Sequence, residues 1–223
     1  MCGIAGILQF NHQPVTAALV QRMTDVIRHR GPDGDGIYTN GSVGLGHRRL
    51  SIIDLSTAGR QPMSNEDGSL WITYNGEIYN FQETRHLLLQ KGHQFQSNTD
   101  TEVILHAYEE WGFDCLTRFN GMFAFALWDQ PRQRLWLARD RLGIKPLFYA
   151  LCPPTSGQPG PFLFGSEIKA LLAGGLLDPK INLTGLHHFL SLNYTPAPHT
   201  LFENIFQLLP GTIWFVTQPV SSS

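Results

Sequence analysis

The sequence predicts an α+β fold, and three observations favour it. Short runs rich in aromatic and β-branched residues predict strands along most of the chain. Two pairs of these runs are joined by short turns, at Asn40-Gly41 and over residues 129–133, as in β-hairpins. Between the strand runs, apolar residues at helical spacing predict helices. The 223 residues suffice to bury the core of one large domain, which we expect over residues 2–173 with an extension over residues 174–223.

The first part of the chain predicts a strand, a helix and a hairpin. Residues 4–8 form an apolar run with small residues, which is typical of a buried strand. Apolar residues at helical spacing predict a helix over residues 15–28. Residues 37–55 then predict strands broken at the Asn40-Gly41 turn.

The middle of the chain combines strands and helices. Residues 71–74 predict a strand, and residues 75–77 predict the turn that ends it. Helices are expected over residues 80–91 and 101–111, the second with capping side chains at its start. Further strands are expected over residues 122–128, 134–138 and 147–151.

The last part of the chain is less regular. Residues 153–161 contain four prolines and two glycines, which predict a surface loop. Later elements are a strand over residues 162–164, helices over 166–172 and 183–190, turns at 195–198 and 210–211, and a strand over 212–217.

Composition excludes several classes of protein. The formal net charge is −2 with histidine neutral, so the chain lacks the basic excess that holds a nucleic-acid backbone. Its longest apolar stretches, such as residues 121–128, are far shorter than the roughly 20 residues that cross a bilayer. No basic segment precedes the apolar run at the N-terminus, so a secretory signal is not indicated. We therefore expect a cytoplasmic protein without nucleic-acid or membrane partners.

Cysteine and histidine spacing indicates neither disulfides nor a metal site. The three cysteines are widely spaced and form no Cys-x-x-Cys pair. Cys115 and Cys152 lie beside apolar residues and are interpreted as structural. Four histidines without cysteine or carboxylate partners at ligand spacing predict no metal ligands in this chain: His29, His47, His93 and His106.

Cys2 is the candidate nucleophile. A small second residue permits removal of Met1, after which Cys2 would carry the free α-amine. The pKa of an α-amine is ordinarily about 7.7–8.0, so part of the amine is neutral near pH 7 and can take the thiol proton. One residue would then supply both nucleophile and base. The alternative is a cysteine that only packs in the core.

Polar residues further along the chain offer a binding site for an amino acid. Arg48 and Arg49 face opposite sides of a predicted strand, and an arginine in a pocket can bind a carboxylate with two hydrogen bonds; the alternative is a surface ion pair. Asn75 and Gly76 supply an amide and a backbone N–H suited to an oxyanion hole, or an ordinary turn. Asp100 would cap a helix or bind an ammonium group.

One further charged run precedes a predicted strand. Arg139, Asp140, Arg141 and Lys145 are interpreted either as a salt-bridged, solvated loop or as a patch that faces a partner.

Several short motifs follow one another in a set order. They are Met1-Cys2-Gly3-Ile4, Arg28-His29-Arg30-Gly31-Pro32-Asp33-Gly34, Arg49-Leu50-Ser51-Ile52-Ile53-Asp54, Tyr74-Asn75-Gly76-Glu77-Ile78-Tyr79-Asn80 and Asp100-Thr101-Glu102, extended by residues 121–126, 138–147 and 165–171. This order resembles that of the class II glutamine amidotransferases, in particular the asparagine synthetase branch, and the resemblance covers roughly residues 2–215.

The resemblance implies a fold and a reaction. The expected fold is the four-layer αββα sandwich of the N-terminal-nucleophile hydrolases, with two mainly antiparallel sheets between helices. Cys2 would attack the side-chain amide of L-glutamine, with its own α-amine as the base. Asn75 and the Gly76 N–H would form the oxyanion hole. A thioester on Cys2 would follow, and water would release glutamate.

The resemblance also implies how glutamine is bound. Arg49 would bind the α-carboxylate, while Glu77 and Asp100 would lie at the α-ammonium group. The backbone that would line the same pocket belongs to Leu50, Ser51, Ile52 and Ile53.

The family pattern continues beyond what this sequence contains. In the asparagine synthetases a second domain uses ATP and magnesium to amidate aspartate, and it begins with a Ser-Gly-Gly-x-Asp-Ser loop that these residues lack. We therefore interpret residues 174–223 as the connector toward an absent synthetase domain, which normally lies on the same chain. No cofactor is expected in this chain, and a homodimer is one option for its assembly.

Two alternatives stay open. The chain could be a catalytically silent module that binds glutamine or regulates a partner, which a retained Met1 would favour. It could also serve a relative that transfers the amide to another acceptor, for instance in polysaccharide or natural-product assembly.

Overall fold

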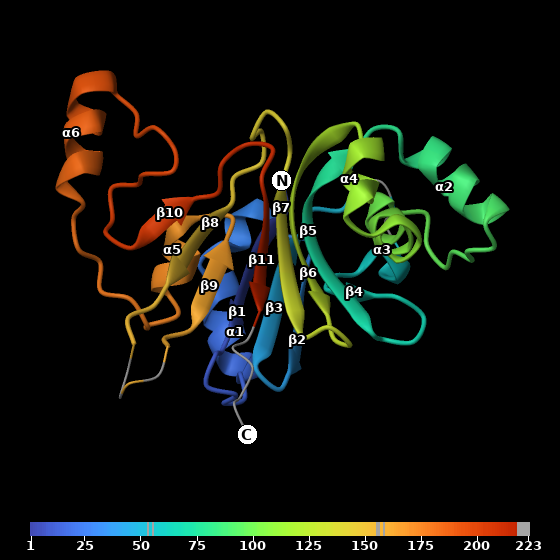
Figure 1. The fold of residues 1–223 in the computed structure, drawn as a ribbon, viewed down its shortest axis with the longest axis horizontal. Helices are drawn as coiled ribbons and strands as arrows, with labels where there is room; N and C mark the ends of the chain where they lie inside the picture. Colours follow the sequence, from blue (N-terminus) through green and yellow to red (C-terminus); the bar gives the residue numbers. More distant parts are fainter. Residues whose placement is uncertain (53, 55, 155–156, 158, 218–223) are drawn as a thin grey trace.

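The computed structural model describes residues 1–217 except 53, 55, 155, 156 and 158. Two antiparallel sheets pack face to face, with helices on both outer faces (Figure 1). In chain order the helices are α1 (Ala17–Asp25), η1 (Arg28–Arg30), η2 (Thr57–Gly59), α2 (Phe81–Gln90), α3 (Asp100–Trp111), η3 (Gly112–Asp114), α4 (Cys115–Arg118), α5 (Ile168–Leu172) and α6 (Leu183–Leu192).

The first sheet has the strand order β10-β8-β9-β1-β3-β2 and the second has β11-β7-β6-β5-β4. The strands of the first are β1 (Gly3–Leu8), β2 (Gly34–Asn40), β3 (Val43–Arg49), β8 (Phe148–Leu151), β9 (Phe162–Gly165) and β10 (Ile205–Gln207). Those of the second are β4 (Met63–Ser64), β5 (Leu70–Ile78), β6 (Gly121–Asp129), β7 (Arg134–Arg139) and β11 (Ile213–Thr217).

Three clusters of buried apolar side chains fill the spaces between the four layers. The middle cluster, which includes Ile4 and Ala126, lies between the sheets. A second cluster joins the first sheet to α1 and α5, and a third joins the second sheet to α2 and α3. This arrangement is the predicted αββα sandwich, and α6 lies outside it (Figure 1).

Strand β1 lies inside the first sheet, between β3 and β9. It pairs with β3 along its whole length, from Gly3 opposite Arg48 to Leu8 opposite Val43. The approach to its neighbours is close, because a Cβ on Gly6 would lie 2.3 Å from the Phe164 ring. The chain therefore enters the core within its first residues, as the apolar run predicts.

The predicted turn over residues 75–77 is wrong. Strand β5 continues to Ile78 and pairs with β6 through Gly76 opposite Phe123. A Cβ on Gly76 would lie only 2.4 Å from the backbone oxygen of Met122. Glycine at this position allows close backbone approach within a sheet rather than a chain reversal.

Other predicted elements differ mainly at their ends. The helix predicted over residues 15–28 is confirmed only from Ala17 to Asp25, because Thr16 caps it by accepting a hydrogen bond from the Leu19 N–H. The hairpin at Asn40-Gly41 is confirmed, with Gly41 at φ +51°.

The extension contributes more to the sandwich than its composition indicates. Strand β10 pairs with β8, and β11 pairs with β7, so each sheet gains an edge strand from it. The division at residues 173 and 174 stays a prediction. Among the described residues, the structure has no helix long and apolar enough to cross a membrane.

Replacing Trp136 tests how much the apolar cluster between the second sheet and helices α2 and α3 stabilises the domain. The centroid of its ring lies 4.9 Å from that of Phe125, 5.1 Å from Tyr108 and 5.5 Å from Phe113. Trp136→Ala removes these contacts and leaves a cavity, so we expect the free energy of unfolding to fall by about 3–5 kcal/mol. Leu142→Ala, at a side chain that is 80% exposed, should change it by less than about 0.5 kcal/mol. Urea unfolding followed by circular dichroism measures both, and equal losses would contradict this expectation.

Candidate functional site

A cavity of about 200 Å³ lies where the start of β1 meets the end of β3, the middle of β5 and the start of α3. This volume is smaller than the roughly 300–1,000 Å³ of pockets for drug-sized ligands and suits a single amino acid. The predicted site residues that line it are Cys2, Arg49, Leu50, Ile52, Asn75, Gly76, Glu77 and Asp100.

The thiol of Cys2 contacts the backbone of Leu50. The Leu50 N–H donates to Sγ at 3.4 Å, and Sγ lies 3.6 Å from the Leu50 oxygen. Burial raises the pKa of the thiol, although the hydrogen bond to Leu50, the N-terminal charge and Arg49 act in the opposite direction. With Met1 in place, the nitrogen of Cys2 is a peptide nitrogen and cannot act as a base. Cys2 gains its base only when Met1 is removed.

Polar contacts hold the backbone next to Cys2. Arg30 donates from Nε to the Cys2 carbonyl oxygen at 3.0 Å and forms an ion pair with Glu167 at 2.9 Å. Two residues along, the Ile4 N–H donates to Ser166 Oγ at 3.0 Å. The Cys2 thiol is therefore positioned by contacts with the folded core and not by a mobile chain end.

Asn75 presents an unused hydrogen-bond donor to the site. Its side chain is 1% exposed and lines the cavity. Within the part of the chain that the structure describes, its Nδ2 has no hydrogen-bond partner. A buried amide without a partner is costly, so this donor is suited to an acceptor atom on a bound ligand.

The structure separates the roles of the two neighbouring arginines. Arg48 turns away from the cavity, donates from Nε to the Thr24 oxygen at 3.1 Å and forms an ion pair with Asp25. Arg49 lines the cavity, and its guanidinium donates to the backbone oxygens of Asp54 and Ser56. Of the two, only Arg49 can meet a ligand here.

Asp100 lies in the first turn of α3 but is not its cap. The cap is Thr99, whose Oγ1 accepts a hydrogen bond from the Glu102 N–H at 3.3 Å. Asp100 Oδ2 accepts instead from the Tyr74 hydroxyl at 2.6 Å and the Ile78 N–H at 2.9 Å. Burial raises its pKa, although these hydrogen bonds act in the opposite direction. The carboxylate joins α3 to β5 at the wall of the cavity.

One predicted residue, Ser51, is not brought into the site, and a second lies outside the described residues. Ser51 does not line the cavity in the described structure, and its N–H donates to Asp33 Oδ2 at 2.9 Å. Ile53 lies outside the described residues.

Gln61 and Lys145 are among the cavity residues that the sequence did not predict. Gln61 also lines the cavity, and its Oε1 accepts a hydrogen bond from the Tyr74 N–H at 2.7 Å. Lys145 also lines the cavity, and its Nζ lies 3.2 Å from the sulfur of Met1. Burial lowers the pKa of Lys145, and Arg30 lowers it further. The charged run near Lys145 was the only signal in the sequence.

That charged run is mostly buried rather than solvated. Asp140 is 1% exposed and accepts hydrogen bonds from the N–H groups of Phe123, Ile144 and Lys145. The interpretation as a solvated loop is therefore wrong, because the Asp140 carboxylate organises the turn that carries Lys145 to the cavity.

Comparison with known proteins identifies the family. Residues 1–222 match a family model described as "Glutamine amidotransferase domain". The chain belongs to this family. The predicted resemblance to the glutamine amidotransferases is confirmed.

Curated relatives of this glutamine amidotransferase domain are longer than the chain. Asparagine synthetase [glutamine-hydrolyzing] 3 of Bacillus subtilis is 42% identical over 95% of this chain and 34% of its own length. Putative asparagine synthetase [glutamine-hydrolyzing] 2 of Methanocaldococcus jannaschii is 38% identical over 93% of this chain and 42% of its length. Amidase chry2 of Gibberella zeae is 35% identical over 95% of this chain and 32% of its own length. The chain thus spans about a third of the length of such relatives.

A solved structure confirms the fold. Glutamine phosphoribosylpyrophosphate amidotransferase from B. subtilis, in complex with ADP and GMP, matches with a TM-score of 0.64 at 21% identity. The match covers 81% of this chain and 45% of that chain. The predicted sandwich of two antiparallel sheets between helices is confirmed by this similarity and by the strand order.

Thiol labelling tests the different surroundings of the cysteines. Burial raises the pKa of Cys115 to about 12 and that of Cys152 to about 11. Near pH 7 we expect iodoacetamide to label Cys2 in the folded chain, because this thiol is partly exposed and lines the cavity. Cys115 and Cys152 should stay unmodified, because both are buried and their raised pKa values disfavour the reactive thiolate. Peptide mass spectrometry measures the labelling, and the urea-unfolded chain is the control in which every cysteine reacts. Labelling of Cys115 at the rate of Cys2 in folded protein would contradict the structure.

Proposed function

We propose that this domain hydrolyses glutamine to glutamate and ammonia, with Cys2 as the nucleophile. One observation carries the proposal: the thiol of Cys2, the guanidinium of Arg49 and the buried amide of Asn75, which has no partner among the described residues, line the same small cavity. The family supports it, and the names of the synthetase relatives describe glutamine hydrolysis.

The reaction would begin once Met1 is removed. The neutral α-amine of Cys2 takes the thiol proton, and the sulfur attacks the side-chain carbonyl carbon of glutamine. Asn75 Nδ2 and the Gly76 N–H donate to the oxygen as it becomes negative. The protonated amine then gives its proton to the departing nitrogen, and ammonia leaves. Water adds to the resulting thioester, which releases glutamate and restores the thiol.

The remaining polar residues of the cavity would hold the substrate. Arg49 binds the α-carboxylate, exchanging hydrogen bonds to backbone oxygens for charge-assisted ones. Glu77 and Asp100 accept from the α-ammonium group. The backbone of Leu50 contacts the Cys2 sulfur and would lie beside the side-chain amide of bound glutamine. Ser51 and Ile53 would act, if at all, through the backbone of the same segment.

We infer that a further domain binds the molecule that accepts the ammonia. The names of several relatives favour aspartate amidation by a synthetase domain on the same chain, and ATP and magnesium would be used there. The similar amidases favour a second candidate, a relative with another acceptor. The glutaminase reaction itself needs only groups of this chain, and we infer a cytoplasmic location for it. A homodimer remains one form of assembly to test.

Replacing the nucleophile tests the proposal directly. We expect Cys2→Ala to lower glutamate release by at least about 10³-fold, because no other group can form the thioester. Cys152→Ala is the matched control, since this cysteine lies in the core cluster beside α1 and α5 and should retain activity. Glutamate is measured by a coupled dehydrogenase assay, and the N-terminus is checked by mass spectrometry. A Cys2→Ala chain as active as its parent would refute the mechanism.

Two further substitutions separate transition-state stabilisation from substrate binding. Asn75→Ala should lower kcat by about 10²–10³-fold, because its amide contacts the oxyanion that forms during the reaction. Arg49→Ala should mainly raise KM for glutamine, by roughly 10- to 150-fold, because a charged hydrogen bond of about 1.5–3 kcal/mol is lost. Steady-state kinetics with both variants measure this. A purely KM effect for Asn75→Ala would remove it from the oxyanion hole.

A further inference from the structure

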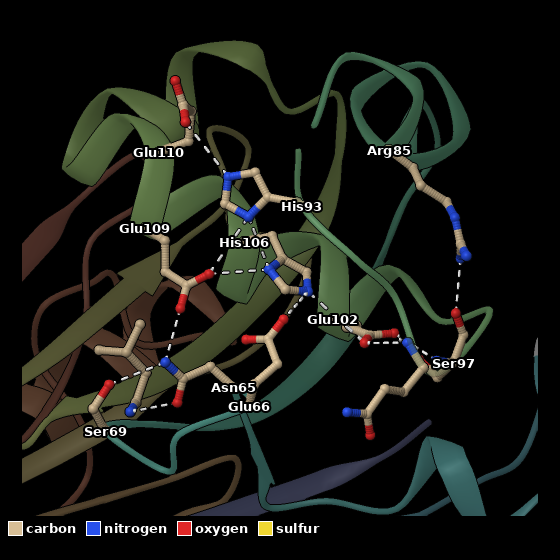
Figure 2. A network of polar contacts seen from close by, with 12 residues as sticks. Asn65, Glu66, Ser69, Arg85, His93, Ser97, Glu102, His106, Glu109 and Glu110 are labelled. Atoms are coloured by element: carbon tan, nitrogen blue, oxygen red, sulfur yellow. Dashed lines mark hydrogen bonds and ion pairs between the residues drawn. The ribbon is translucent and has the colours of Figure 1, made fainter. Parts of the chain in front are cut away.

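A second polar cluster lies further along α3, beyond the first turn that lines the glutamine cavity. Figure 2 shows His106 and Glu109 on α3 with His93 from the connection between α2 and α3 pointing toward them. His93 Nδ1 lies 3.1 Å from His106 Nδ1, and His106 Nδ1 lies 3.0 Å from Glu109 Oε2. His93 Nδ1 lies 3.7 Å from the same carboxylate oxygen. Three metal-ligating atoms therefore converge on one point.

The triangle of these atoms has the size of one face of a tetrahedral metal site. Zinc binds nitrogen and carboxylate oxygen at about 2.0–2.2 Å, which places tetrahedral ligands roughly 3.3–3.5 Å apart. The observed separations of 3.0, 3.1 and 3.7 Å bracket this value. Two imidazole nitrogens and one carboxylate form a ligand set that zinc uses in proteins.

Each of the three side chains is also held through its other polar atom. His93 Nε2 lies 3.4 Å from Glu110 Oε2, and Asn65 Nδ2 donates to Glu109 Oε1 at 2.8 Å. His106 Nε2 lies 3.6 Å from a Glu66 carboxylate oxygen and 3.8 Å from one of Glu102. Carboxylates behind histidine ligands orient the ring and raise its basicity in known metal sites.

The surroundings favour a cation and leave room for another ligand. His93 and Glu109 line an open cavity of about 480 Å³ next to the cluster, where water can complete the coordination. Four carboxylates surround the two imidazoles, and among them only Glu110 has a lysine partner in the described structure, Lys91 at 2.6 Å. The negative charge of these carboxylates around the two imidazoles favours a cation.

We propose that His93, His106 and Glu109 bind one divalent transition-metal ion, with zinc as the best match to the ligands and water as the fourth ligand. The site is structural: the ion ties the segment over residues 92–99 to α3. This proposal is independent of glutamine hydrolysis.

The segment matters because it leads into the wall of the glutamine cavity. Glu102, one turn before His106 on α3, accepts hydrogen bonds from the N–H groups of Gln96 and Ser97, both at 2.7 Å. Thr99 and Asp100, which line the glutamine cavity, follow directly. A metal at His93 would anchor the far end of the same connection.

Zinc binding to the full chain tests the proposal. The measurement uses Cys2→Ala protein, because an N-terminal thiol and amine would themselves bind zinc, and this background separates the result from the glutaminase proposal. After treatment with a chelator, we expect one zinc per chain by calorimetry and elemental analysis, and an increase in Tm. Cobalt in place of zinc should give the visible absorption of a tetrahedral ion.

Ligand variants give the decisive comparison. His93→Gln and Glu109→Gln change partly exposed side chains, so the chain should fold, and each should weaken zinc binding by more than about 100-fold. His86→Gln, at an exposed histidine on α2, is the matched control and should bind like the parent. Hydrogen exchange over residues 92–99 should slow when zinc binds. Equal binding by His93→Gln and the parent, no stoichiometric binding, or exchange unaffected by zinc would overturn the proposal.

Discussion

The pairing of β1 inside the first sheet is the constraint on which the candidate site depends. Most chain ends are mobile, but here the second residue directly precedes a strand that is hydrogen-bonded on both sides. Arg30 and Ser166 fix the backbone of Cys2 and Ile4 from the flanking segments. The thiol therefore has a fixed position before any ligand binds, and such preorganisation is what a nucleophile needs.

The two sheets then bring the binding groups to that thiol. Buried polar contacts join them next to the cavity, since Thr73 Oγ1 donates to the Gly46 oxygen at 3.0 Å and His47 Nε2 lies 3.1 Å from the Tyr74 oxygen. Burial lowers the pKa of His47 to about 4, so this histidine is neutral near pH 7 and serves the fold. Because these contacts join β3 to β5, the side chains of Arg49 and Asn75 line one cavity although they belong to different sheets.

Helix α3 connects this cavity to the histidine cluster. Its first turn carries Asp100, which is bonded to β5 through Tyr74 and Ile78. Glu102, also in the first turn, and His106, one turn further on, make contacts that hold the connection from α2. One helix thus carries a residue of the cavity wall, Asp100, and also the residues that hold the segment leading to that wall.

Local sequence pattern was enough to predict several elements and the family. Strand β1, the Asn40-Gly41 hairpin and α3 follow from side-chain periodicity and turn chemistry, and the order of short motifs identified the family, while the roles of the site residues stay a prediction. Other features became visible only in the folded chain. Strand β5 runs through Gly76, Lys145 and Gln61 line the cavity, and β10 and β11 form edge strands of the two sheets. The tertiary structure also brings His93 to His106 and Glu109, a cluster of possible ligands that the sequence did not predict. These features depend on contacts between residues far apart in the chain, and periodicity reports only what neighbours along the chain do.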